Sequence, residues 1–432
     1  MRNSLLKRLM LTGLAVPILI SAVFIALQFV HDPGSDTPAV AVTDVGRQIR
    51  QGQYLAQAGN CMACHTSRGG PAYAGGRRIE TPFGALYSPN ITPDASSGIG
   101  KWNADDFWRA LHNGKSRDGH FLYPAFPYTE YTLMPRADSD ALFAYFRTLA
   151  PVSRPNRAHA LRFPYDQRPL LAGWRALYFT PGEFVPDPTR SVQWNRGAYL
   201  VQGPGHCSAC HAARNALGAS KHGSGLGGGL VPAQGWYAPS LAADGEAGLG
   251  TWSTSQITEL LKTGVTAQAS VFGPMAEVVA QSLQHLSDSD LAAMATYLKS
   301  LPPTAAERVG RETPREAVDE AVLTRGARLY ADHCSSCHQD DGRGAAPAYP
   351  PLAGNRAITM ASAINPIRIV LNGGFAPGTT GNPRPYGMPP YGPSLSDAEI
   401  AAIVTYIRNQ WGNQAAAVSA QEVGRNRAVP ID

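Results

Sequence analysis

The sequence predicts a mainly α-helical chain of three tandem repeats, joined by loop-rich connections and preceded by an N-terminal transmembrane helix. A five-residue motif, CxxCH, occurs three times, and an amphipathic helical pattern follows each copy. A long uncharged segment precedes the first repeat. Gly and Pro are plentiful, at 44 and 35 residues, while charged residues make up only 16% of the chain. This composition favours compact, loop-rich domains.

The predicted transmembrane helix covers residues 9–30, which carry no charge and follow three basic residues. A helical span needs about 20 apolar residues, so this segment is long enough. Basic residues before a span stay in the cytoplasm, so the rest of the chain is expected on the far side of the membrane. The alternative is a cleaved signal peptide with its small-residue site at 39–41.

The repeats and their connectors divide the chain into seven parts. These are an anchor with a linker (1–43), the first repeat (44–150), a strap rich in Pro and aromatic residues (151–190), the second repeat (191–302), a charged linker (303–318), the third repeat (319–412) and a flexible tail (413–432). We expect the strap to be extended, with one short helix near residues 170–178, and to pack on the repeats. No segment shows a convincing strand alternation.

Each repeat opens and closes with a helix. The opening helix leads into the motif and carries a glycine and an aromatic residue; it is expected at 47–60, 195–206 and 323–333. The closing helix has apolar residues at i, i+3, i+4 and i+7; it is expected at 137–149, 287–301 and 396–410. Ser396 with Glu399 has the spacing of a capping box, and Ser287 with Asp290 approximates one, so both pairs mark helix starts.

The three motifs are CMACH at 61–65, CSACH at 207–211 and CSSCH at 334–338, and together they contain all six cysteines. A structural zinc site normally needs four ligands, but each motif lies alone in its repeat. A redox dithiol does not require the histidine and belongs to a βαβ context. Covalent attachment of haem c uses both thiols for thioether bonds and the histidine for the iron. This chemistry alone employs both cysteines and the histidine of the motif.

We therefore predict three covalently bound haem c groups. The thioether bonds are expected at Cys61, Cys64, Cys207, Cys210, Cys334 and Cys337, and the axial histidines are His65, His211 and His338. The predicted second axial ligands are Met134, Met275 and Met388, each in a Pro-containing segment ahead of a closing helix. His112 and His120 are the competitors of Met134 for the first haem. Iron closed by His and Met transfers electrons and leaves no open site.

Other functional classes find little support. The net charge of +5 is small for 432 residues, and no basic run is interleaved with aromatic residues, which disfavours nucleic acid as a partner. No catalytic triad, phosphate loop or pair of acidic residues stands out. Two alternatives to a dehydrogenase-linked carrier stay open: a free-standing respiratory cytochrome, and a haem enzyme or gas-binding module with an open iron site.

Longer stretches carry a resemblance to a known family. They are GQYLAQAGNCMACHT, WNRGAYLVQGPGHCSACHAARNALG and GPMAEVVAQSLQHLSDSDLAAMATYLKSL. Over residues 44–411 the chain resembles the triheme cytochrome c subunit of bacterial membrane-bound periplasmic dehydrogenases of the alcohol, aldehyde and gluconate type. The resemblance implies three tandem class-I cytochrome c domains in a non-catalytic electron-transfer subunit. It also implies attachment to the inner membrane, with the haem domains in the periplasm.

The resemblance implies partners as well. A separate catalytic subunit holding pyrroloquinoline quinone, flavin or molybdopterin oxidises the substrate, in some complexes together with a small iron–sulfur subunit. The cytochrome passes the electrons to ubiquinone or a terminal oxidase. The strap sequence ALRFPYDQRPLLAGWRALYFTPGEF is most similar to cytochromes paired with molybdopterin aldehyde or N-heterocycle dehydrogenases.

Overall fold

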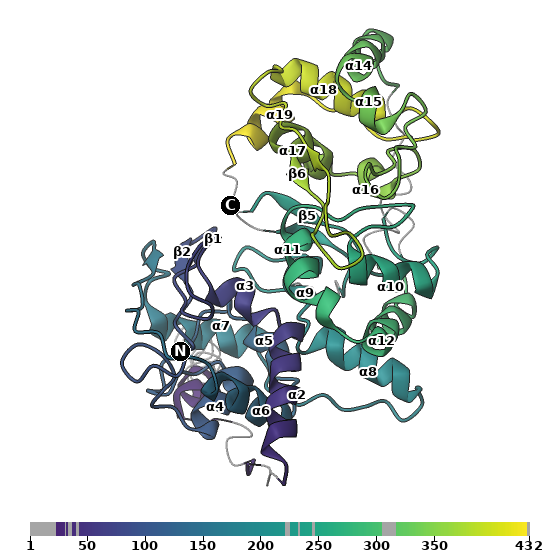
Figure 1. Cartoon of the computed structure of the whole chain (residues 1–432). Helices are drawn as coiled ribbons and strands as arrows, with labels where there is room; N and C mark the ends of the chain where they lie inside the picture. Colours follow the sequence, from purple (N-terminus) through teal and green to yellow (C-terminus); the bar gives the residue numbers. More distant parts are fainter. Residues whose placement is uncertain are drawn as a thin grey trace, which may run out of the picture.

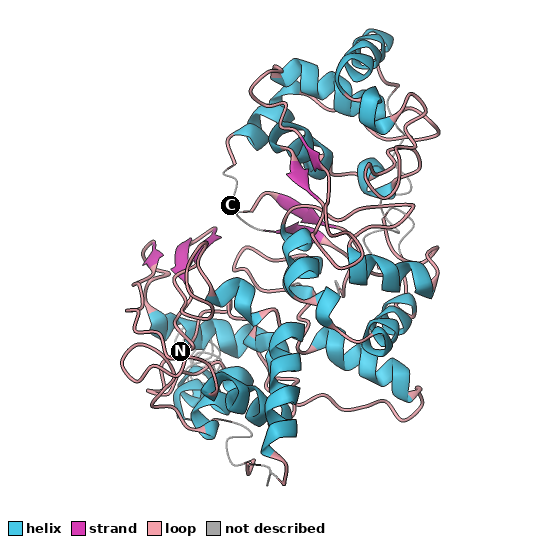
Figure 2. Ribbon diagram, in the orientation of Figure 1, coloured by secondary structure: helices cyan, strands magenta, loops and turns pink. Residues whose placement is uncertain are grey.

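The structure is a computed structural model that describes residues 23–30, 32, 37–39, 43–220, 225–231, 234–243, 247–304 and 317–429. Helices dominate it, and the strands between them are two to four residues long (Figure 2). The predicted mainly α-helical class is confirmed. The strands escaped sequence analysis because pairs this short cannot display an alternating pattern.

The first repeat runs from helix α2 to helix α6, which pack against each other (Figure 1). Asp44 caps α2 by accepting a hydrogen bond from the Arg47 amide, and Asn103 starts α4 in a capping box with Asp106. The elements are α2 (Val45–Ala58), α3 (Cys61–His65), β1 (Arg78–Thr81), β2 (Gly84–Tyr87), α4 (Ala104–Asn113), α5 (Tyr128–Tyr131) and α6 (Arg136–Arg147).

The strap packs on the repeats, as predicted. Its elements are β3 (Ala160–Leu161), η1 (Arg168–Leu170) and α7 (Leu171–Tyr178), so the helix expected near 170–178 is confirmed. Strand β3 joins β1 and β2 in an antiparallel sheet. Arg175 of α7 is buried at 1% exposure and donates to the Asn113 carbonyl. The Trp174 indole donates to the Leu217 carbonyl at 3.0 Å, which ties the strap to the second repeat.

The second and third repeats also begin with an opening helix and a motif helix, but their strand pairs lie at different places in the order of elements. The second contains α8 (Val192–Gln202), α9 (Ser208–His211), β4 (Gly229–Val231), β5 (Trp236–Ala238), α10 (Thr254–Thr263), α11 (Pro274–Gln281), η2 (Leu283–His285) and α12 (Asp288–Lys299). The third contains α14 (Glu320–His333), α15 (Ser335–His338), α16 (Arg356–Thr359), α17 (Ile364–Asn372), β6 (Gly374–Phe375), β7 (Gly387–Met388), α18 (Asp397–Ile407) and α19 (Ala420–Arg427). The capping box of Ser396 and Glu399 is present, and Ser287 accepts from the Asp290 amide, as predicted.

One glycine in each opening helix explains how the opening and closing helices cross. A Cβ on Gly52 would lie 1.9 Å from the Ala141 carbonyl oxygen of α6. The same distance would separate a Cβ on Gly197 from the Ala293 carbonyl oxygen of α12. A Cβ on Gly326 would lie 2.4 Å from the Ala402 carbonyl oxygen of α18. Only glycine permits backbones to approach this closely, so these three residues set the crossing points of α2 with α6, α8 with α12 and α14 with α18.

The cores of the repeats are unequal. One continuous apolar cluster runs through the first two repeats, from Leu55 and Leu142 to Leu200 and Leu298. The third repeat has separate clusters, the larger one around Ile367 and Ile400. It lies at the top of Figure 1, beyond β5 of the second repeat. The first two repeats therefore form one packed body to which the third is attached.

The prediction of a flexible tail after residue 412 is wrong. Residues 413–429 are ordered, and helix α19 begins with a capping box of Ser419 and Glu422. Val418 and Val423 are buried against α17 and α18. These few apolar residues are too sparse to show periodicity, yet they complete the third core.

Two further predictions fall on parts of the chain that the structure describes incompletely. Residues 9–22 of the expected membrane helix lie outside the described residues, while 23–30 are helical. Within the described ranges, no helix has both the length and the apolar character that a membrane span requires. Of the linker at 303–318, residues 305–316 also lie outside the description.

Candidate haem-attachment sites

The histidines of the three motifs share one hydrogen bond. In each repeat the Nδ1 of the motif histidine faces the carbonyl of a proline farther along the chain: His65 with Pro89 at 2.8 Å, His211 with Pro239 at 2.7 Å, and His338 with Pro350 at 3.0 Å. A carbonyl can only accept, so Nδ1 carries the hydrogen and Nε2 keeps its lone pair. Burial lowers the pKa of all three imidazoles, and the bond to the carbonyl only partly opposes this effect. The lowered pKa favours the neutral imidazole, which is the form that binds iron.

The six cysteines form no disulfide. The first cysteine of each motif, Cys61, Cys207 and Cys334, lies against the apolar core. Burial raises the pKa of each of these thiols to about 12. Such surroundings disfavour the thiolate that a zinc site would need. They suit a thioether, which carries no charge.

The first site brings the predicted ligands to one cavity. A cavity of about 2100 Å³ is lined by Cys61, Cys64, His65 and Met134, and it extends to Cys210 of the second motif. Met134 lies between α5 and α6 and is 1% exposed. A buried sulfur facing a large cavity that also holds the motif fits a haem clamped between His65 and Met134.

The competing histidines are placed differently. His112 is buried, its Nδ1 lies 3.0 Å from the Thr132 carbonyl, and its ring stacks on Trp108 at 4.3 Å. His120 lines the cavity, but its Nδ1 lies 2.5 Å from the Asp118 carboxylate. His112 is not among the residues that line the cavity, and the ring of His120 is held by the Asp118 carboxylate, so Met134 is the better candidate.

Met275 and Met388 lie near their motifs in less enclosed positions. Met275 is the second residue of helix α11, not part of a loop as expected, and packs on the shared core that Cys207 also contacts. Met388 lies in β7 and packs on the same cluster as Cys334. Met294 and Met360, for which the sequence predicts core packing, are both 2% exposed.

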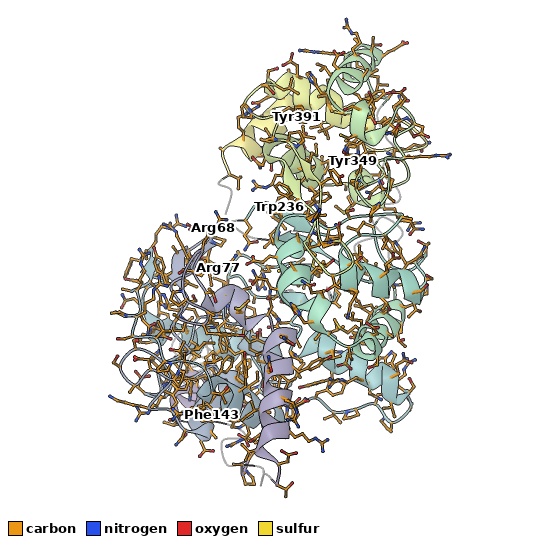
Figure 3. The ribbon with its side chains drawn as sticks, in the orientation of Figure 1. Arg68, Arg77, Phe143, Trp236, Tyr349 and Tyr391 are labelled. Atoms are coloured by element: carbon orange, nitrogen blue, oxygen red, sulfur yellow. The ribbon has the colours of Figure 1, made fainter. Side chains whose placement is uncertain are left out.

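Sequence reasoning missed the groups around the motifs. The proline carbonyls were missed because their separation from the histidine differs in every repeat. Arg77 donates to the Ala63 carbonyl inside the first motif at 2.6 Å, and Arg214 donates to the Ala209 carbonyl inside the second at 2.5 Å. Figure 3 shows Arg77 on the first repeat, on the side that faces the second. An arginine 12 or three residues after the motif histidine gives no recognisable spacing.

Comparisons with known proteins find a match in each of the three repeats. The sequence profile of the cytochrome c family matches residues 49–150, 195–302 and 323–411. Over 88% of its length the chain is 43% identical to a subunit of nicotinate dehydrogenase from Pseudomonas putida, of which it spans only 31%. It is 39% identical to the cytochrome c subunit of alcohol dehydrogenase (quinone) of Gluconacetobacter polyoxogenes, covering 88% of this chain and 84% of that subunit. The gluconate 2-dehydrogenase cytochrome c subunit of Pantoea cypripedii is also 39% identical, covering 88% and 89%.

Proposed function

Because the chain belongs to the cytochrome c family, among the cytochrome c subunits of dehydrogenases, we propose that it holds three haem c groups and conducts electrons between them. The observation that supports this most is the hydrogen bond from the motif histidine to a proline carbonyl, which recurs in all three repeats. It presents one free imidazole nitrogen per motif beside two thiols. When bound, haem supplies reversible one-electron transfer.

The residues of the chain would hold each haem in the same way. The cysteine pairs would attach it, and the iron would be held by His65, His211 and His338 together with Met134, Met275 and Met388. Met134 is the best supported of the three methionines because it is buried in the cavity of its own motif. With both faces filled, the sites exclude oxygen and peroxide from the iron.

The proposed partner is the catalytic subunit of a dehydrogenase. Relatives named as subunits of alcohol, gluconate and nicotinate dehydrogenases support a small organic substrate of the alcohol or aldehyde class. The family resemblance of the sequence supports pyrroloquinoline quinone, flavin or molybdopterin in the partner. The word quinone in the name of the alcohol dehydrogenase relative supports ubiquinone as the acceptor, with a terminal oxidase as the alternative. An iron–sulfur subunit is a further proposed partner.

We place the chain at the inner membrane, with the haem repeats on the periplasmic side. The uncharged segment at 9–30 and the basic residues before it support this location. Haem c attachment outside the cytoplasm agrees with a chain whose six cysteines are used in motifs and form no disulfide.

The test uses membranes from cells that express the chain with its neighbouring genes. Ethanol, acetaldehyde, gluconate and nicotinate are added separately, and the reduced haem bands are recorded. One substrate should reduce the haem, and the chain should copurify with a catalytic subunit. A cytochrome that purifies alone and responds to none of them would indicate a free-standing carrier, and a spectrum altered by carbon monoxide would indicate an open iron site.

A further inference from the structure

The first haem-attachment motif is contacted by a charged residue of the second repeat. Arg77, which donates to the Ala63 carbonyl between Cys61 and Cys64, also forms a two-pronged ion pair with Glu277, with distances of 2.5 and 2.8 Å. Glu277 lies in α11, two residues after Met275. A single arginine thus connects the attachment turn of one haem with the helix that carries the proposed ligand of the next.

The second motif is likewise contacted by a charged residue of the other repeat, in this case the first. Ser208, between the cysteines of this motif, donates to the Glu130 carboxylate at 2.8 Å. Glu130 belongs to α5 and is 9% exposed. Its other partner is the hydroxyl of Thr129, and no ion pair of Glu130 occurs within the described part of the chain. Arg214, the arginine of this motif, donates instead to the carbonyls of Ala209 and Gly218.

These charges act on the atoms to which haem attaches. Glu130 raises the pKa of both Cys207 and Cys210, although burial is the larger cause, and at Cys210 the charge of Arg214 opposes Glu130 more strongly. Glu277 acts in the same direction on Cys64, where Arg77 opposes it more strongly. His206 also lies close to Glu130, but burial lowers the pKa of this imidazole, which favours its neutral form. Glu130 is therefore a buried carboxylate beside the second motif that forms no ion pair among the described residues, whereas Glu277 is paired with Arg77.

We propose that Glu130, a residue of the first repeat, lowers the reduction potential of the haem attached in the second, and that Glu277 acts on the first haem through Arg77. A negative charge stabilises ferric over ferrous iron, and its effect is larger where burial keeps water away. The effect of Glu130 should exceed that of Glu277, which Arg77 neutralises at a site about one-third exposed. The inference rests on the proposed attachment of three haems.

The test is a spectroelectrochemical titration of the full-length, matured protein, which resolves three potentials. Glu130→Gln should raise one of them. Glu277→Gln leaves Arg77 without its carboxylate and should raise a different one. Glu259→Gln, at an exposed position in α10, is the matched control and should move none. Because the two variants must act on different haems, the result needs no prior assignment of the potentials.

Three more variants complete the test. Arg77→Gln should lower the same potential that Glu277→Gln raises, and the Arg77→Gln/Glu277→Gln double variant should return it close to the original value. If the Glu130→Gln protein does not mature, Glu130→Asp keeps the charge but draws it back from Ser208, and it should raise the same potential by a smaller amount.

The outcomes separate this inference from the proposed function. Fewer than three haems in the unaltered protein would contradict the function itself. Three haems, together with potentials that Glu130→Gln leaves unchanged, would overturn only the role of Glu130. If both glutamate variants shift the same potential, the proposal that Glu130 and Glu277 act on different haems is wrong.

Discussion

The first two repeats share one core, whereas the third keeps its own and is attached through few contacts. Tyr54 of the first repeat donates to Asp290 of the second at 2.6 Å, and the Arg77 to Glu277 pair adds a second bridge. The third repeat meets the second through hydrogen bonds that residues 378–380 form with Thr263 and Gln284, and through Asn365. Its side chain accepts from the Tyr237 amide at 2.9 Å and donates to the Tyr237 carbonyl at 2.7 Å.

Beside Asn365, the Arg368 guanidinium lies over the Trp236 ring, 5.1 Å from its centre, and Figure 3 shows Trp236 where the second and third repeats meet. Three repeats with the same sequence pattern have thus packed differently: the first two share one core, and the third is attached to them with a core of its own. The opening and closing helices pack in pairs in all three repeats, so this difference lies in the contacts between repeats, which involve other elements as well.

The largest expected effect comes from the helix crossings. Gly52→Val places a side chain against the Ala141 carbonyl and should destabilise the fused body by about 4 kcal/mol or more. Gly326→Val should instead unfold only the third repeat. Limited proteolysis followed by haem staining of the fragments distinguishes the two. Equal loss of all three haems in both variants would contradict the division into two bodies.

The methionines provide the next comparison. Met134→Ala should open the first iron to carbon monoxide and also destabilise the fused body by about 3 kcal/mol, because Met134 is fully buried. Met388→Ala should open one iron with a smaller loss of stability, since Met388 is only partly buried. Carbon monoxide difference spectra and thermal unfolding measure both effects, with Met62→Ala as the control. An unchanged spectrum would show that the altered methionine is not a ligand.

The bridge at Asp290 should respond to pH. Burial pulls the pKa of Asp290 upward, but hydrogen bonds from Arg196 and Tyr54 outweigh it and hold the pKa below its ordinary value. The stabilisation that ionised Asp290 gives to the fused body is therefore complete above about pH 4, and it is lost as the pH falls through the lowered pKa of Asp290. Asp290→Asn should cost about 2 kcal/mol at pH 7 and should lessen the acid sensitivity of the fused body. An unchanged dependence of unfolding on pH between 5 and about 2 would contradict this role.

The smallest effect is expected where the third repeat is attached. Asn365→Ala removes both hydrogen bonds to Tyr237 and should weaken the contact by about 1 to 2 kcal/mol without loss of haem. Because no titratable group takes part in this pair, the change should not depend on pH. The rate at which limited proteolysis separates the third repeat from the fused body measures the weakening of this contact, and we expect that rate to rise. Asn426→Ala, which breaks a bond inside α19, is the control and should leave the separation rate unchanged.

Much of the architecture could be predicted because it depends on local patterns. The motif positions, the apolar stripes of α6, α12 and α18 and the cap at Ser396 all follow from residues close in sequence. The proline carbonyls, Glu130 and the Asn365 pair join residues from 12 to 128 positions apart, and no periodic signal marks them. Helix α19 was missed for another reason: a single turn of apolar contacts, centred on Val423, is enough to order it.

The measurement that tests the account most directly is peptide mass spectrometry of the matured protein. Peptides containing residues 61–65, 207–211 and 334–338 should each carry the mass of one haem on their two cysteines. A protein in which any one of these peptides appears only with free thiols, while the other two carry haem, would contradict the claim that all three repeats conduct electrons.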